Sequence, residues 1–246
     1  MLGLTSVTFR KLSRVQVVQL AARAGADAVE WGTDVHVTDL NAAADARALC
    51  AGEGIAVNSM GSYYRPGTDT GDFEKVCELA CTLGAHIIRV WCGSSGSRGT
   101  GAQTLSQLVE QVHTMCKTAR SYEQTVAFEF HKGTFNDRGA SWRRFSDLAN
   151  EPNLKTYWQP MFAGRDEANL REVMADTVVV HMFNWNRLGV KYPLEDGIKK
   201  LSQFFYILGR GQYKGDILLE FVKGDSPEQF LEDYKALKVL AGGVGM

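Results

Sequence analysis

Eight short apolar segments alternate with eight helical segments along the whole chain of 246 residues. One segment and the helix after it take about 30 residues, the length of a strand–helix unit. Strict alternation of this kind predicts a parallel sheet covered by helices. Eight units, without a Gly-rich phosphate-binding turn after the first strand, favour a closed (β/α)8 TIM barrel over an open doubly wound sheet. We therefore expect one barrel domain over residues 1–246.

The expected strands are apolar runs with many branched residues, and the expected helices are amphipathic. We expect strands at 4–9, 26–31, 55–62, 86–91, 126–130, 155–159, 178–183 and 215–222. We expect helices at 14–24, 41–52, 72–83, 104–122, 140–149, 166–174, 193–208 and 227–240. Asn41 and Ser226 are the expected N-caps of two of these helices, and Gly25 and Gly84 are expected to end two others.

Charge and cysteine content restrict the partners and the compartment. The formal net charge of −1 offers no basic excess for nucleic acid. The five cysteines form no CxxC pair, which is typical of reduced thiols in a cytoplasmic protein. The N-terminus lacks the pattern of a signal peptide, and no apolar run is long enough for a membrane helix. We expect a small-molecule ligand, no membrane partner, and leave association into a homo-oligomer open.

Three of the expected strands end in Glu129, His181 and Glu220. A buried, unpaired charge is costly, so each of these side chains needs a partner. The carboxyl ends of barrel strands meet at one mouth, which would bring the three together. Two carboxylates and an imidazole suit Mn²⁺, Co²⁺, Mg²⁺ or Zn²⁺. Gln159, at the end of the sixth strand, is placed either to supply a fourth oxygen ligand or only to bind substrate.

Other polar and aromatic residues also lie at strand ends. Glu30 follows the second strand, where pairing with Arg10 would be a structural alternative to a functional role. Of the five histidines, His36 and His131 also lie just after strand ends. His86 starts a strand and His113 lies within a helix, so both are expected to be structural. Aromatic side chains at the same end favour a pocket for a small polar ligand that stacks on rings. The tryptophans at these positions are Trp31, Trp91, Trp158 and Trp185.

This ordered set of motifs resembles the xylose isomerase-like TIM barrel superfamily, in particular its sugar phosphate isomerase/epimerase group. The resemblance covers nearly the whole chain. It rests on Glu30-Trp31-Gly32 with His36, Ile88–Trp91, Phe128–His131, Tyr157–Pro160, His181 and Leu219–Phe221.

The resemblance implies site residues. In ketose 3-epimerases of the superfamily, matching positions hold a divalent metal, which would make Glu129, Gln159, His181 and Glu220 the ligands here. Gln159 is a departure, because those epimerases have Asp. Arg187 lies six residues after His181, as an arginine does in those enzymes. Substrate hydroxyls would then be held by His131, Lys132 and Arg187, and the sugar would stack on Trp31, Trp91, Trp158 and Trp185. His36 is a further expected substrate-binding residue.

The expected activity is that of a divalent-metal-dependent isomerase or epimerase of a keto sugar or related polyol ketone. Glu129 and Glu220 would act as base and acid around a metal-stabilised enediolate. One alternative is a lyase or dehydratase on a keto-sugar, keto-inositol or keto-glycoside, with the same site. Another is a non-catalytic sugar-binding barrel, which Gln159 keeps open. The loop Gly93–Arg98 is either a phosphate-binding loop or, preferably, a plain flexible loop.

Overall fold

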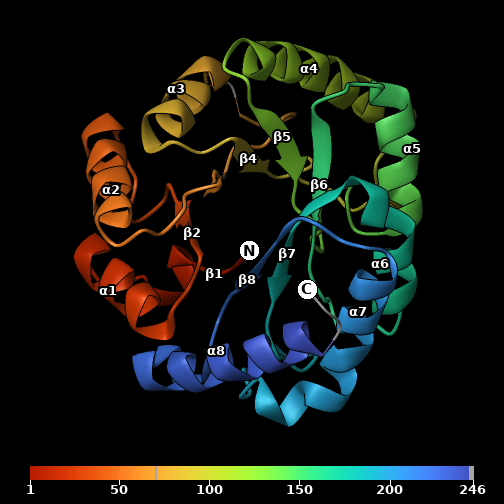
Figure 1. The fold of residues 1–246 in the computed structure, drawn as a ribbon. Coiled ribbons are helices and arrows are strands. Elements are labelled where there is room, and N and C mark those ends of the chain that lie inside the picture. Colours follow the sequence, from red (N-terminus) through yellow and green to blue (C-terminus); the bar gives the residue numbers. More distant parts are fainter. Residues whose placement is uncertain (70, 244–246) are drawn as a thin grey trace.

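Eight parallel strands close into a barrel in which β1 pairs with β8 (Figure 1). The computed structural model describes residues 1–69 and 71–243. Neighbouring strands follow the chain order, and the helices surround the barrel as an outer ring. The TIM barrel fold expected from the sequence is confirmed.

The strands are short and mostly buried. They are β1 (Leu2–Thr5), β2 (Ala28–Gly32), β3 (Ser59–Gly61), β4 (Ile87–Val90), β5 (Thr125–Phe128), β6 (Leu154–Trp158), β7 (Thr177–Met182) and β8 (Asp216–Leu219). The α-helices are α1 (Arg14–Ala24), α2 (Leu40–Gly52), α3 (Phe73–Leu83), α4 (Ala102–Ser121), α5 (Gly139–Ala149), α6 (Asp166–Val173), α7 (Ile198–Arg210) and α8 (Pro227–Gly242). Among the described residues, no helix is long and apolar enough to cross a membrane.

Several boundaries differ from the expected ones: the third strand is Ser59–Gly61 rather than 55–62, and α7 begins at Ile198 rather than at 193. Two further differences have a local cause. The first strand stops at Thr5, and Ser6–Phe9 forms a short 3-10 helix. The hydroxyl of Ser6 accepts a hydrogen bond from the Gly32 amide, which ties this segment to β2. Side-chain hydroxyls of this kind compete with strand pairing. Helix α2 is capped by Asp39, whose carboxylate accepts from Ala42 N at 2.8 Å, so the expected cap at Asn41 is wrong.

The alternation of side chains along each strand decides which residues reach the barrel interior. Ala127, Tyr157, Val179 and Leu218 form one small buried cluster, separate from the main core. Successive side chains of a strand point to opposite faces, so residues two positions further on face the same way. Those residues are Glu129, Gln159, His181 and Glu220. The interior at the carboxyl ends of β5–β8 is therefore polar.

A pair of glycine substitutions tests how the helices end. Gly25 ends α1 with φ 63°, and its amide donates to carbonyls of the last turn. We expect Gly25→Ala to lower the free energy of unfolding by about 1–2 kcal/mol, because a left-handed residue with a Cβ is strained. Gly52, the last residue of α2, is the control: an added Cβ meets nothing within 4 Å. Urea unfolding should show Gly52→Ala neutral or slightly stabilising; equal losses in both variants would contradict this account.

Candidate active site

Glu30 is the hub of a buried group of polar side chains inside the barrel mouth. Its Oε1 lies 3.3 Å from Arg89 Nε and 3.3 Å from His181 Nε2. Its Oε2 accepts hydrogen bonds from the hydroxyls of Ser59 at 3.0 Å and Tyr157 at 2.8 Å. All five side chains are buried. Both carboxylate oxygens are thus paired, which makes Glu30 a fixed anion rather than a mobile acid or base.

Two arms extend from this hub to the predicted catalytic carboxylates. On one side, Arg89 Nη1 donates to Glu129 Oε2, and Gln159 Nε2 donates to Glu129 Oε1 at 3.1 Å. On the other side, His181 Nδ1 lies 3.4 Å from Glu220 Oε2. We call the whole set the charged network: Glu220, His181, Glu30, Arg89, Glu129 and Gln159.

The charges of the network hold one another ionised. Burial would lower the pKa of His181, but the carboxylates of Glu220 and Glu30 raise it to about 10. Burial would raise the pKa of Glu30, but His181 and Arg89 lower it to about 2. The pKa of Arg89 stays well above its usual value, because the nearby carboxylates outweigh burial. The cations of Arg89 and His181 therefore lie on either side of the Glu30 carboxylate.

Gly61 makes room for the buried arginine. A Cβ added at Gly61 would lie 2.4 Å from Arg89 Nη2, closer than atoms approach without displacement. The two residues pair directly across β3 and β4. The glycine is thus required by the close approach of the guanidinium, not by its own backbone angles.

The structure corrects the pairing considered for Glu30. Arg10 donates instead to the carboxylate of Asp34 and to the hydroxyl of Tyr63, both on the mouth side of the barrel. Arg89, which lies two residues before Trp91 and faces the interior, is the cation that Glu30 contacts. The alternative with Arg10 is therefore wrong.

Trp31 and Trp158 do not reach the mouth, which corrects their expected stacking on a sugar. Both rings have no exposed surface and belong to the main core. Trp158 packs edge-on against Phe204 of α7, at 5.0 Å between centroids. Each tryptophan is the direct neighbour of an inward-facing network residue, so alternation turns it outward to the helices.

His36 is occupied within the protein. One ring nitrogen lies 3.1 Å from the Ser6 hydroxyl, and the other lies 3.0 Å from the carbonyl of Leu12. The side chain is 3% exposed, which leaves little surface for a substrate. The structure thus gives His36 a role in holding the loop after β1 against the loop after β2.

The other predicted residues line the rim of the mouth in two aromatic groups. The ring centroid of Trp91 lies 4.3 Å from that of His131 and 6.4 Å from that of Tyr63, on which Trp91 stacks. The guanidinium of Arg65 lies 3.9 Å from the centroid of the Trp91 ring. Across the mouth, the ring centroid of Trp185 lies 4.7 Å from that of Phe183 and 4.8 Å from that of Phe221. The indole N–H groups of Trp91 and Trp185 are buried without a hydrogen-bond partner, as are those of Trp31 and Trp158.

Backbone strain accompanies the site. Phe221 directly follows Glu220 and has φ 54°, and its amide donates to the hydroxyl of Thr8 at 3.2 Å. Phe162, three residues after Gln159, has φ 53°. Bulky residues rarely adopt these angles, and such strain concentrates at functional sites.

Lys132 and Arg187 lie beside the network rather than in it. Both line an open cavity of about 550 Å³ under the loops after β4 to β7. Arg187 donates to the carbonyl of Phe162 at 3.1 Å, which fixes its side chain along the cavity wall.

The four predicted metal ligands are present at the mouth as two pairs. His181 and Glu220 fit an ion once His181 has lost a proton, because a metal ligand must be a neutral imidazole: His181 Nδ1 and Glu220 Oε2 are buried, adjacent and without a hydrogen-bond partner. Glu129 and Gln159 bond to each other, and Glu129 also accepts from Arg89. Within residues 1–69 and 71–243, no three His, Cys, Asp or Glu side chains group as for a metal. The donor types fit a divalent ion, with His181 and Glu220 as its nucleus.

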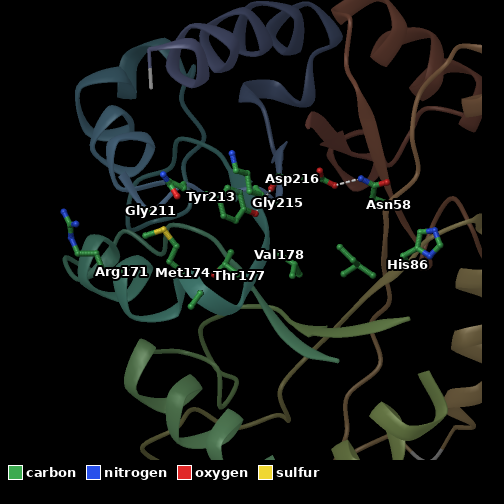
Figure 2. Close-up of a pocket in the computed structure, with 14 residues that line it drawn as sticks. Asn58, His86, Arg171, Met174, Thr177, Val178, Gly211, Tyr213, Gly215 and Asp216 are labelled. Carbon is green, nitrogen blue, oxygen red and sulfur yellow. Dashed lines mark hydrogen bonds between the residues drawn. The ribbon is translucent and has the colours of Figure 1, made fainter. Parts of the chain in front are cut away.

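A second cavity, of about 830 Å³, lies at the opposite end of the barrel (Figure 2). Figure 2 shows the side chain of Asp216 joined to Asn58, whose Nδ2 lies 2.9 Å from it. The same carboxylate lies 3.2 Å from the N-terminal ammonium of Met1. Because functional sites of such barrels lie at the carboxyl ends of the strands, we assign this end to stability.

The sequence reasoning missed Arg89, Ser59 and Tyr157 as parts of the site. Arg89 stands in an apolar strand two positions before Trp91, which places it on the inward face. A charge at such a position needs a buried counter-charge, and this was the available signal. The hydroxyls of Ser59 and Tyr157 carried no comparable signal, since either fits a strand.

Adding a methyl group at Gly61 tests whether Arg89 is held tightly. We expect Gly61→Ala to lower the free energy of unfolding by about 1–3 kcal/mol, because the guanidinium is enclosed by its partners and cannot move away. Gly99 serves as the control, since an added Cβ there meets its nearest atom at 3.7 Å. If urea unfolding gives the same value for Gly61→Ala and Gly99→Ala, the close packing of Arg89 is not supported.

The comparisons with known proteins agree with this architecture. A probable 3-DHS dehydratase, AsbF, from Bacillus anthracis superposes with a TM-score of 0.81 at 17% identity, over 96% of this chain and 98% of that one. A D-psicose 3-epimerase structure gives 0.80 at 14% identity, covering 100% and 99%. A xylose isomerase domain protein from Planctomyces limnophilus gives 0.76 at 18%, covering 99% and 96%.

At these identities the superpositions show the fold. No curated protein sequence matches the chain. The sequence model for the xylose isomerase-like TIM barrel matches residues 18–240, which is most of the chain. The protein belongs to the xylose isomerase-like TIM barrel family.

Proposed function

We propose that the protein is an isomerase or epimerase of a keto sugar or related polyol ketone. The observation that carries the proposal is the position of two buried carboxylates, Glu129 and Glu220, at the carboxyl ends of β5 and β8. These strands are separated by β6 and β7 in the closed order, so the two carboxylates approach the mouth from different sides. A ligand between them would present one face to each.

Carboxylates on two sides of a bound ketone suit proton transfer at a carbon next to the carbonyl. One carboxylate removes the proton, and the other returns a proton on the opposite face, which gives epimerisation. Return of the proton to the neighbouring carbon gives aldose–ketose isomerisation instead. Arg89 and Gln159 hold the carboxylate of Glu129 by hydrogen bonds, so its direction is set before substrate arrives.

The enolate formed by proton loss carries negative charge on oxygen. Arg89 is a preorganised cation inside the mouth, and it is buried where charge interactions are strong. A divalent ion held by His181 and Glu220, with Glu129 and Gln159 completing the set, would supply Lewis-acid polarisation of the carbonyl.

Amide substitution of the two carboxylates tests the roles of the residues. We expect Glu129→Gln and Glu220→Gln each to slow exchange of solvent deuterium into a keto-sugar substrate by about a hundredfold or more, because a carboxamide cannot take up the proton. NMR measures the exchange, and thermal unfolding checks that each variant folds. Glu232→Gln on the exposed surface of α8 is the control and should exchange as the wild type does.

The same measurement separates the alternative reactions. Deuterium in an otherwise unchanged or epimerised sugar supports the isomerase, whereas loss of water or of a glycosidic leaving group identifies the lyase. Binding of the sugar with no exchange, in the presence of Mn²⁺ or Co²⁺, identifies a non-catalytic barrel and overturns the proposal. Unchanged exchange in both Glu→Gln variants would refute the residue assignment.

Gln159 provides a test of the metal site. Gln159→Asp places a carboxylate near that of Glu129, so we expect a lower free energy of unfolding without metal. With metal, we expect a several-fold lower dissociation constant for Mn²⁺, on the order of the gain from one charged ligand. Calorimetric titration and thermal unfolding measure the two effects. Gln203→Asp on exposed α7 adds the same charge away from the site. Equal Mn²⁺ affinity in wild type and both variants would remove Gln159 from the ligand set.

A further inference from the structure

The cavity beside the mouth is strongly cationic although the whole chain has a formal net charge of −1. Its charged lining residues are five cations and one carboxylate: Arg98, Lys132, Arg138, Arg165, Arg187 and Asp137. A volume of about 550 Å³ lies in the range of small-molecule sites. We call this space the cationic cavity.

Most of these cations lack a counter-charge within the protein. Of the five cations, only Arg138 takes part in an ion pair among residues 1–69 and 71–243, at 3.9 Å from Asp137. The Asp137 carboxylate is also used by the backbone, since it accepts from the Ser97 amide at 3.1 Å. Arg187 also lies near Lys200 of α7, whose pKa is lowered mainly by burial, raised by Asp166 and lowered to a lesser degree by Arg187. Like charges gathered in this way are unfavourable unless an anion binds among them.

The cationic cavity is built next to the charged network. Lys132 follows Glu129 by three residues, which span at most about 10 Å of chain. Arg165 and Arg187 follow Gln159 and His181 by six residues each, on the loops after β6 and β7. The α6 and α7 helices that follow these loops are neighbours in the outer ring (Figure 1). A ligand a few carbon atoms long can therefore reach both places.

The walls of the cationic cavity are held in place. The carbonyl of Phe162 accepts from Arg187 Nε, and Phe162 itself keeps the strained φ of 53°. Lys200 Nζ lies over the ring of Phe162, 3.6 Å from its centre. Asp166 fixes the start of the same loop through the amide of Met161, at 2.9 Å. The Arg187 fork is thus oriented before any ligand binds, which suits recognition of an oxyanion.

From the position and charge of the cationic cavity we infer that the substrate carries an oxyanionic group, a phosphate ester or a carboxylate. The inference rests on the proposed function for the reacting end of the substrate and adds the second end. The anion binds among Arg138, Arg165 and Arg187, while the ketone lies between Glu129 and Glu220. The anion also anchors the sugar so that its reacting carbon meets the two carboxylates.

Binding of inorganic phosphate tests the cavity apart from catalysis. We expect phosphate to bind the wild-type protein saturably and to shift the NMR signals of the cavity residues. The affinity for phosphate should fall as salt is added. The double variant Arg138→Gln/Arg165→Gln should bind about tenfold more weakly or worse, since a hydrogen bond to a charged group contributes on the order of one factor of ten in affinity. Arg144→Gln, an exposed arginine of α5 outside the cavity, should bind as wild type does. Phosphate affinity that is equal in all three proteins overturns the inference.

Deuterium exchange then links the cavity to the substrate. A keto sugar, its phosphate ester and a keto-uronate of equal length are compared, and the arm with the higher kcat/KM distinguishes phosphate from carboxylate. The double variant should lose this advantage through a higher KM for the anionic sugar, whereas Arg144→Gln should keep it. Equal kcat/KM for neutral and anionic sugars overturns the inference and leaves the proposed function standing. Phosphate binding at the cavity without exchange in any sugar has the opposite meaning: the cationic cavity stands and the proposed function fails.

Discussion

The paired charges of Glu30, Arg89 and His181 are the constraint around which the barrel mouth is built. Each of these side chains is buried, and each would be costly to bury alone. Glu30 satisfies both cations at 3.3 Å and also accepts two hydroxyl hydrogen bonds. Arg89 can then also pair with Glu129, and His181 with Glu220, without leaving an unpaired buried charge. The central glutamate is thus the support for the two carboxylates proposed to react.

The eight-unit alternation was sufficient to predict the fold, because periodicity and strand–helix order depend only on local sequence. Helix boundaries were predicted best where a cap is local, as at Gly25 and Ser226. The short helix Ser6–Phe9 was not predicted, since it depends on a hydrogen bond from Gly32 on the next strand. Long-range contacts of this kind cannot be read from one segment.

The site was only partly predictable, and alternation explains both the success and the errors. Glu129, Gln159, His181 and Glu220 lie two positions beyond interior residues, and the structure places all four at the mouth. Trp31 and Trp158 were chosen because they end strands, but each lies one position away from an inward-facing residue. A strict period of two would have excluded both tryptophans. It would have selected Arg89, which lies two residues before Trp91 and on the same face of the strand.

Arg89 also changes the meaning of Gln159. With an aspartate at position 159, a second carboxylate would lie near Glu129, and a single buried arginine would face a larger negative charge. The amide instead donates to Glu129, so the pair carries one negative charge that Arg89 balances. The charged network can therefore form in the absence of a metal, and an ion held by His181 and Glu220 would enter a mouth already close to neutral. Positive charge without a counter-charge lies outside the network, in the cationic cavity, where an anionic ligand would balance it.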